Sequence, residues 1–243
     1  MLKPFWLAIQ FLSRLPSPQY AEVTAKEQGA SVNWFPVVGG LIGLLLVFLG
    51  QLNYWLPAEV VAGLVLTVWV VSTGALHLDG LADMADGWLG GQGDSERTLA
   101  IMKDSAIGTG GGVALITLLL LKWTLLVIVI EQQAWWLLAA APIVGRIAAI
   151  NLMPVTTYVS AKGIAEEMFL HLNSTAIWGW FCLLMIAVIW LNIWLFLSLI
   201  VVWFWLRWLM IKMTGGMTGD TAGAMTEVIE LTWLLGVVAL LIN

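Results

Sequence analysis

The sequence has 243 residues, of which 61% are hydrophobic and only 10% are charged. Soluble domains carry about 25% charged residues, so this chain has too few to cover a globule in water. Its net charge of −5, without a basic stripe, excludes nucleic acid as a partner. The composition predicts an integral membrane protein, and the length suits one domain over residues 1–243.

Apolar segments recur along the chain, each close to the ~20 residues that cross a bilayer as a helix. A short amphipathic helix within residues 5–15 is expected to lie at the membrane interface. Beyond it, the sequence predicts an all-α transmembrane bundle of about seven spans, with six to eight compatible, at roughly 34–56, 57–76, 108–130, 134–153, 175–191, 194–212 and 222–242. The fifth and sixth spans form one apolar run, which we divide at Leu191-Asn192-Ile193.

The basic residues predict an orientation. Apart from Lys122, which falls inside a span, every Lys and Arg lies before the first span, in alternate loops or at the adjoining span ends. Cytoplasmic loops of membrane proteins are enriched in Lys and Arg. We therefore expect a bacterial inner-membrane protein whose N-terminus and basic loops face the cytoplasm.

The segment 77–87 is the most informative part of the sequence. Asp79, Asp83 and Asp86 stand at i, i+4 and i+7, so on a helix their carboxylates share one face. Like charges beside a membrane repel one another unless a cation gathers them, and Mg²⁺ is held by carboxylates together with substrate phosphates. The spacing predicts a Mg²⁺ site; the alternative is a solvated helix end.

Two glycine-rich clusters are expected on the same side of the membrane. Asp104 and Ser105 precede the glycines at 108 and 110–112, so they either cap the third span or help its N-terminus to bind phosphate. Asp220 lies within 215–224, where it either adds an acid to the site or caps the last span. Together with the acidic segment, these clusters suggest a diphosphate held between a metal ion and a helix N-terminus.

Several ionisable residues are expected deeper in the bundle. Glu227 and Glu230 fall inside the last apolar segment and are predicted to line the substrate path or to pair with Arg207 or Lys122. Lys122 needs a buried carboxylate partner because it is far from either membrane surface. Arg146 is a candidate phosphate ligand, with simple snorkelling as the alternative. The amphipathic loop 154–175, which includes Lys162, is expected to cover the site.

These motifs, in this order, resemble those of the membrane cobalamin synthases, the adenosylcobinamide-GDP ribazoletransferases. The matching pieces are 11–16, 77–83 with 86–87, 101–105 with 107–108, and 215–216 with 218–221 and 223–224. At Met217 the family pattern has Gln. The acidic segment also resembles, more distantly, that of the CDP-alcohol phosphotransferases, which gather two metal ions with aspartates on adjoining helices.

The resemblance implies the nucleotide-loop assembly step of cobalamin biosynthesis. A ribose hydroxyl of α-ribazole, or of its 5′-phosphate, attacks the phosphorus attached to adenosylcobinamide; adenosylcobalamin, or its 5′-phosphate, forms and GMP leaves. The enzyme is then a Mg²⁺-dependent transferase of a substituted phosphate group. The expected partners are these two substrates and the lipid bilayer, while a homo-oligomer or contacts with other cobalamin-assembly enzymes are left open.

Within this interpretation each candidate residue receives a role. The predicted metal ligands are Asp79, Asp83, Asp104 and Asp220. Asp86 is the predicted catalytic base, with His77 as the second candidate. The predicted substrate and phosphate ligands are Arg97, Lys103, Ser105, Gly108, Arg146, Thr218 and Thr221.

Two other functions are compatible with these residue types. A CDP-alcohol phosphotransferase of phospholipid synthesis would use the same acids, but its Ala-Arg pair shortly after the second Asp is missing from this sequence. An ion-coupled transporter would place its acids near mid-bilayer. In this sequence the only ionisable residues expected at that depth are the acids Glu227 and Glu230 and the basic Lys122.

Overall fold

A computed structural model describes residues 2–160 and 164–242 of the chain. Among them it contains only helices, turns and one isolated β-bridge. The α-helices are α1 (Lys3–Leu12), α2 (Ala25–Ser31), α3 (Phe35–Gly50), α4 (Ala58–Thr73), α5 (Leu76–Gly91), α6 (Ser95–Met102), α7 (Thr109–Glu131), α8 (Trp135–Ile150), α9 (Ile164–Leu170), α10 (Ser174–Leu191), α11 (Ile193–Thr214) and α12 (Gly219–Leu241).

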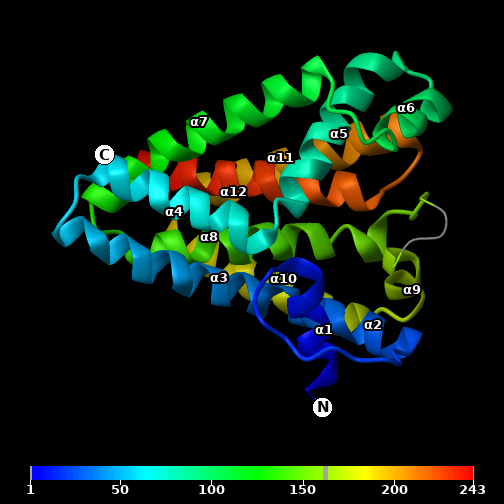
Figure 1. Cartoon of the computed structure of the whole chain (residues 1–243), viewed down its shortest axis with the longest axis horizontal. Coiled ribbons are helices and arrows are strands. Elements are labelled where there is room, and N and C mark those ends of the chain that lie inside the picture. Colours follow the sequence, from blue (N-terminus) through cyan, green and yellow to red (C-terminus); the bar gives the residue numbers. More distant parts are fainter. Residues whose placement is uncertain (1, 161–163, 243) are drawn as a thin grey trace.

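The predicted helical membrane bundle is confirmed. Within the described ranges, 6 helical segments are long and apolar enough to cross a membrane, and 7 if the bent pair α4–α5 is one span. The first of them joins α2 and α3 into one segment from Ala25 to Tyr54, earlier than the predicted start at residue 34. Figure 1 shows the long helices side by side, with α6 and α9 at one end and the C-terminus at the other.

Asn192 confirms the division of the long apolar run. Its backbone is extended (φ −167°, ψ 128°), which ends α10, and its side-chain oxygen accepts hydrogen bonds from the amides of Trp194 and Leu195 at 2.8 and 3.1 Å. A short polar side chain that satisfies the free amides of the first turn starts a new helix. The long apolar run therefore forms two separate helices, α10 and α11, each long enough to cross a membrane.

A sharp bend between α4 and α5 positions the acidic segment. The two helices meet at 86°, with Gly74 and Ala75 both in the left-handed conformation (φ 63° and 59°). The amide of Arg14 donates to the carbonyl of Ser72 at 2.7 Å and so ties the N-terminal region to this corner. The bend turns α5 away from the line of α4, and α5 packs against α12 and α7 instead.

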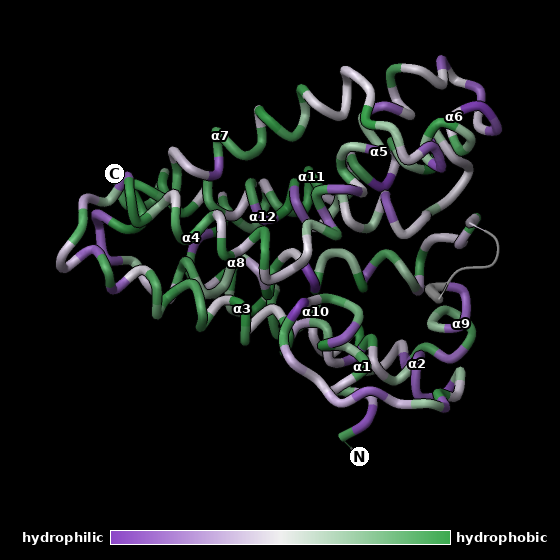
Figure 2. The backbone as a smooth tube through the Cα atoms, in the orientation of Figure 1, coloured by the Kyte–Doolittle hydropathy of each residue, from purple (hydrophilic) through white to green (hydrophobic). Residues whose placement is uncertain are grey.

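Hydrophilic residues are unevenly distributed over the fold. Figure 2 shows mainly hydrophobic colours along the long helices and more hydrophilic segments around α5, α6 and α9. A helix is found where the sequence predicts a short amphipathic one: α1 buries Leu7, Ala8, Ile9 and Leu12, while its other residues are half-buried or exposed. The polar end of the bundle is where the candidate site lies.

Candidate active site

A cavity opens between α1, α5, α8, α9 and α12 and contains about 830 Å³ of empty space, part of it open to solvent. Its polar lining comes from His77, Asp79, Arg146, Thr218, Asp220 and Thr226. Its apolar lining includes Phe11, Phe35, Met153, Tyr158, Met168, Phe169 and Met217. Helices far apart in the sequence therefore bring several of the predicted site residues to one place.

The aspartates of α5 lie on one helix, as predicted, and reach the start of α12. α5 lies beyond the bend and is not itself one of the six long apolar segments. Partial burial raises the pKa of Asp83 to about 6, and the negative charges of Asp220, Asp79 and Asp86 act in the same direction. Among the ion pairs of the described residues, none involves any of these four carboxylates. The site thus concentrates negative charge that no basic side chain of the described chain neutralises.

Gly80 allows this meeting of α5 and α12. A Cβ atom at Gly80 would lie 2.5 Å from the carbonyl oxygen and 2.8 Å from the Cα of Asp220. On the facing helix, a Cβ at Gly223 would lie 3.2 Å from the Cα of His77. Because the two backbones touch at these glycines, Asp79 and Asp83 on one helix lie beside Asp220 on the other.

Thr218, not Asp220, caps α12, so the capping alternative for Asp220 is wrong. The Thr218 hydroxyl accepts the amide of Thr221 at 3.2 Å, and the Thr221 hydroxyl accepts the amide of Thr218 at 2.8 Å. Such a reciprocal box satisfies two otherwise free amides. It leaves the Asp220 carboxylate available to the cavity, while the two predicted threonine ligands are buried and engaged in the cap.

Asp86 holds the N-terminus of α7. Its two oxygens accept hydrogen bonds from the amides of Gly108 at 2.7 Å and Gly111 at 2.9 Å. Neither Asp104 nor Ser105 caps this helix, so the capping alternative for them is wrong. An anion is favoured at the positive end of a helix. Here the carboxylate of Asp86 occupies the N-terminus of α7, where the sequence predicts a phosphate.

The glycine-rich cluster at 104–112 lies beside Asp86 and outside the main cavity. Asp104 is exposed, accepts the amide of Ala106 at 3.0 Å, and lines a shallow hollow together with Asp86 and Gly108. The other predicted ligands of this region, Arg97, Lys103 and Ser105, are exposed on or after α6. The predicted metal ligands are therefore split, with Asp79, Asp83 and Asp220 in one group and Asp104 in the neighbouring hollow. Among the residues described, no group of three or more His, Cys, Asp or Glu side chains is arranged as a metal site.

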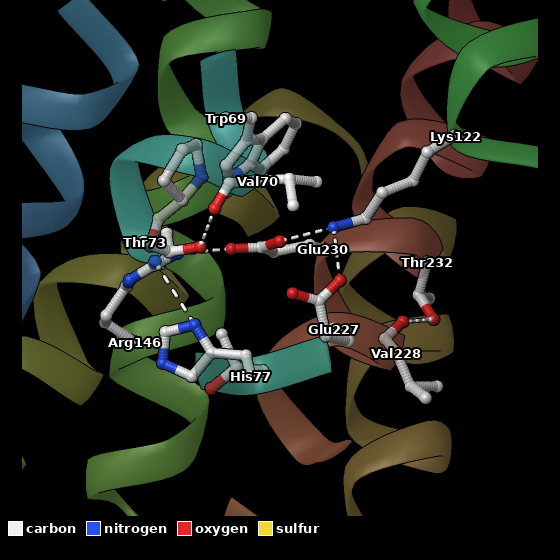
Figure 3. Close-up of polar contacts among 12 residues, drawn as sticks. Trp69, Val70, Thr73, His77, Lys122, Arg146, Glu227, Val228, Glu230 and Thr232 are labelled. Atoms are coloured by element: carbon white, nitrogen blue, oxygen red, sulfur yellow. Dashed lines mark hydrogen bonds and ion pairs between the residues drawn. The ribbon is translucent and has the colours of Figure 1, made fainter. Parts of the chain in front are cut away.

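A buried charge network lies deeper in the bundle (Figure 3). Lys122 Nζ donates to Glu227 Oε2 at 2.7 Å and to Glu230 Oε2 at 2.6 Å, which confirms the predicted carboxylate partner. Glu230 also pairs with Arg146, whose Nη2 lies 3.4 Å from His77 Nδ1. The predicted phosphate ligand Arg146 is only 1% exposed. Its guanidinium forms an ion pair with Glu230 in the cavity wall, so its positive charge is already compensated.

Described residues of the loop 154–175, which the sequence predicts to cover the site, line the cavity. Tyr158, Met168 and Phe169 line it, and the loop is fixed by a bridge in which the amide of Met217 donates to Thr157 at 2.8 Å and that of Val159 to Met217 at 3.0 Å. Lys162 of this loop lies outside the described residues. The aromatic lining was not predicted, because Phe and Tyr in a membrane sequence give no sign of which ones face a cavity.

The chain is similar to proteins of one family over almost its entire length. The family model described as Cobalamin-5-phosphate synthase matches residues 4–238. An adenosylcobinamide-GDP ribazoletransferase of Pseudomonas putida (strain W619) is 46% identical over 237 residues, covering 96% of this chain and 97% of the relative. The protein of the same name from Pseudomonas entomophila (strain L48) is 45% identical over 238 residues, with the same coverage. No solved structure matches the chain. The chain belongs to the cobalamin-5-phosphate synthase family.

Proposed function

We propose that this protein is an enzyme that joins adenosylcobinamide-GDP and α-ribazole, or α-ribazole 5′-phosphate, to give adenosylcobalamin, or its 5′-phosphate, and GMP. Membership of the family and the names of its 46%-identical relatives support this reaction. The observation that carries the proposal is the meeting of Asp79 and Asp83 with Asp220 beside a cavity, since an uncompensated acidic cluster suits the gathering of cation and diphosphate.

We propose further that Asp79, Asp83 and Asp220 hold Mg²⁺. The chemistry of the donors fits this ion, because all three side chains are carboxylates and hard divalent cations prefer oxygen. The described side chains are not arranged as a metal site, so binding would have to draw the three carboxylates together. Burial and, after it, the negative charges of Asp220, Asp79 and Asp86 raise the pKa of Asp83, and a bound cation would relieve the repulsion among these charges. When bound, the ion would neutralise charge on the diphosphate and on the leaving GMP. Asp104, at the edge of the site, would take part through a cation-bound phosphate group of the substrate.

The ribose hydroxyl needs a proton acceptor, and we retain Asp86 for this role, with His77 second. Each carboxylate oxygen has two lone pairs, and each oxygen of Asp86 uses one for an α7 amide. The remaining lone pairs can accept the hydroxyl proton while the amides keep the carboxylate fixed. His77 is less suitable through Nδ1, because that atom faces the guanidinium of Arg146.

We also propose that the site faces the cytoplasm of a bacterial inner membrane, with the N-terminus on the same side. The enrichment of Lys and Arg at the end of the bundle that carries α6 supports this orientation. The substrates would then reach the acids from the cytoplasm.

The test uses the purified full-length protein in liposomes. Adenosylcobinamide-GDP, α-ribazole and Mg²⁺ are added, and GMP and the complete corrinoid are quantified by liquid chromatography and mass spectrometry. We expect the two products in equal amounts, loss of turnover after EDTA treatment, and recovery when Mg²⁺ is returned. Absence of GMP from a folded preparation supplied with both substrates would refute the reaction, and full turnover in EDTA would refute the metal.

A further inference from the structure

The main cavity has two chemically different parts. Near α5 and α12 it is lined by the carboxylates Asp79 and Asp220. The remainder is lined mostly by Phe, Leu, Ile and Met side chains and by Tyr158, and its other polar residues are His77, Arg146, Thr218 and Thr226. A ligand that fills it must therefore combine an apolar body with a polar group that reaches the acids.

Aromatic rings from separate elements form much of the apolar part. Phe11 of α1 and Phe35 of α3 are stacked with 5.7 Å between ring centroids and 19° between their planes. Tyr158 and Phe169 of the covering loop lie 4.7 Å apart at 34°. Aromatic rings arranged in this way offer faces against which a flat ring system can stack.

We propose that this cavity binds the planar base of the nucleoside acceptor, α-ribazole, so that its ribose lies at the polar end beside Asp79 and Asp220. The inference rests on the proposed function and adds to it the place of one substrate and the residues that select its base. Dimethylbenzimidazole is flat, carries two methyl groups and has no N–H donor when it is joined to ribose. These properties match a wall of Phe, Met and Leu.

The same wall is unsuitable for the guanine of the other substrate. Guanine has several donors and acceptors along its edge, and burying them without partners costs about 2–7 kcal/mol for each group. Most polar atoms of the cavity wall are engaged: the Thr226 hydroxyl donates to Ala222 at 3.0 Å, and Arg146 Nη1 is bonded to Glu230 and Pro142. Arg146 Nε is buried without a partner among the described residues, but one donor cannot satisfy the several groups on the edge of guanine. The guanine and the large, amide-bearing corrinoid are therefore placed outside this cavity, toward the open face of the acids.

In this arrangement the covering loop makes the enzyme selective for the base of its nucleoside substrate. Phe169 and Tyr158 line the cavity and contact each other, so a larger base would have to displace them. Removing one aromatic ring that stacks on a base weakens binding about tenfold or more. The loss should appear for α-ribazole and not for adenosylcobinamide-GDP.

The experiment compares Phe169→Ala with Phe204→Ala in the full-length protein. Phe204 is 58% exposed on α11 and outside the cavity, so it is a control for loss of a phenylalanine ring. We expect Phe169→Ala to raise the KM for α-ribazole about tenfold, to leave the KM for adenosylcobinamide-GDP within twofold, and Phe204→Ala to change neither. A rise only in the KM for adenosylcobinamide-GDP, or no change in either KM, would overturn the proposal.

Binding without turnover separates this proposal from the proposed function. The affinity of α-ribazole alone is measured by calorimetry on detergent-solubilised wild type, Phe169→Ala and the milder Phe169→Leu. Weaker binding in the order wild type, Leu, Ala supports the site even if no turnover is detected. Equal affinity in all three proteins, alongside normal wild-type turnover, would leave the reaction standing and refute the site.

Discussion

Glu230 is the centre of the buried charge network, and its removal should destabilise the protein more than removal of any exposed acid. The side chain is 0% exposed and pairs with both Lys122, at 2.6 Å, and Arg146. In Glu230→Ala, Lys122 keeps Glu227 as a partner at 2.7 Å. Among the described residues, Arg146 keeps the carbonyl of Pro142 and the nearby ring of His77, and no carboxylate.

The expected magnitude follows from which charge is left alone. Breaking one buried ion pair destabilises a protein by about 3–5 kcal/mol, chiefly because an uncompensated charge remains buried. Since Lys122 retains a carboxylate, the effect of Glu230→Ala should correspond to one such pair and not two. For a chain of this size, that free energy lowers the melting temperature by on the order of 10 °C.

Thermal unfolding in detergent, followed by tryptophan fluorescence, measures the effect. Glu131→Ala is the matched control, since Glu131 is exposed at the end of α7. The double variant Glu230→Met with Arg146→Met should recover much of the loss, because a buried pair exchanged for apolar side chains is often neutral. If Glu230→Ala melts no lower than Glu131→Ala, the network does not stabilise the fold as argued.

Two further predictions concern the contacts of α5. Gly80→Ala should lower turnover at least tenfold, because its methyl group would lie 2.5 Å from the Asp220 carbonyl oxygen and separate the acids. The control Gly112→Ala, whose methyl group would meet nothing within 4 Å, should keep wild-type turnover. Equal turnover in the two variants would contradict the close approach of α5 and α12. Asp86→Ala should destabilise the first turn of α7 by about 2 kcal/mol, since it removes a carboxylate that accepts two amides at a helix N-terminus. Hydrogen exchange at the amides of 108–111 measures this, and unchanged protection would show that Asp86 is not the cap.

Local patterns made a large part of the fold predictable. The apolar runs gave the number of spans, and the i, i+4, i+7 spacing gave a helix that carries the aspartates on one face, because both depend only on neighbouring residues. The need of a mid-span Lys122 for a carboxylate was also predictable, since an isolated charge in an apolar bundle is strongly disfavoured.

Contacts between distant segments were not predictable in the same way. Asp86 and Gly111 are separated by 25 positions, and nothing in the local sequence indicates that a carboxylate of one helix caps another. The corner at Gly74 and Ala75 was missed because an alanine with φ 59° has no local sequence signature. The aromatic lining of the cavity comes from α1, α3 and the loop 154–175, and it forms only when these segments are packed together.

The most direct test of the account is the turnover of Asp83→Asn and Asp220→Asn under saturating substrates and Mg²⁺. The two carboxylates come from different helices, and the account requires both to act at one metal-dependent site. Each variant should insert, melt as the wild type does and lose at least about 100-fold in GMP release, while Glu131→Gln at the exposed C-terminal end of α7 keeps full activity. Near-normal GMP release by either aspartate variant would contradict a shared acidic centre.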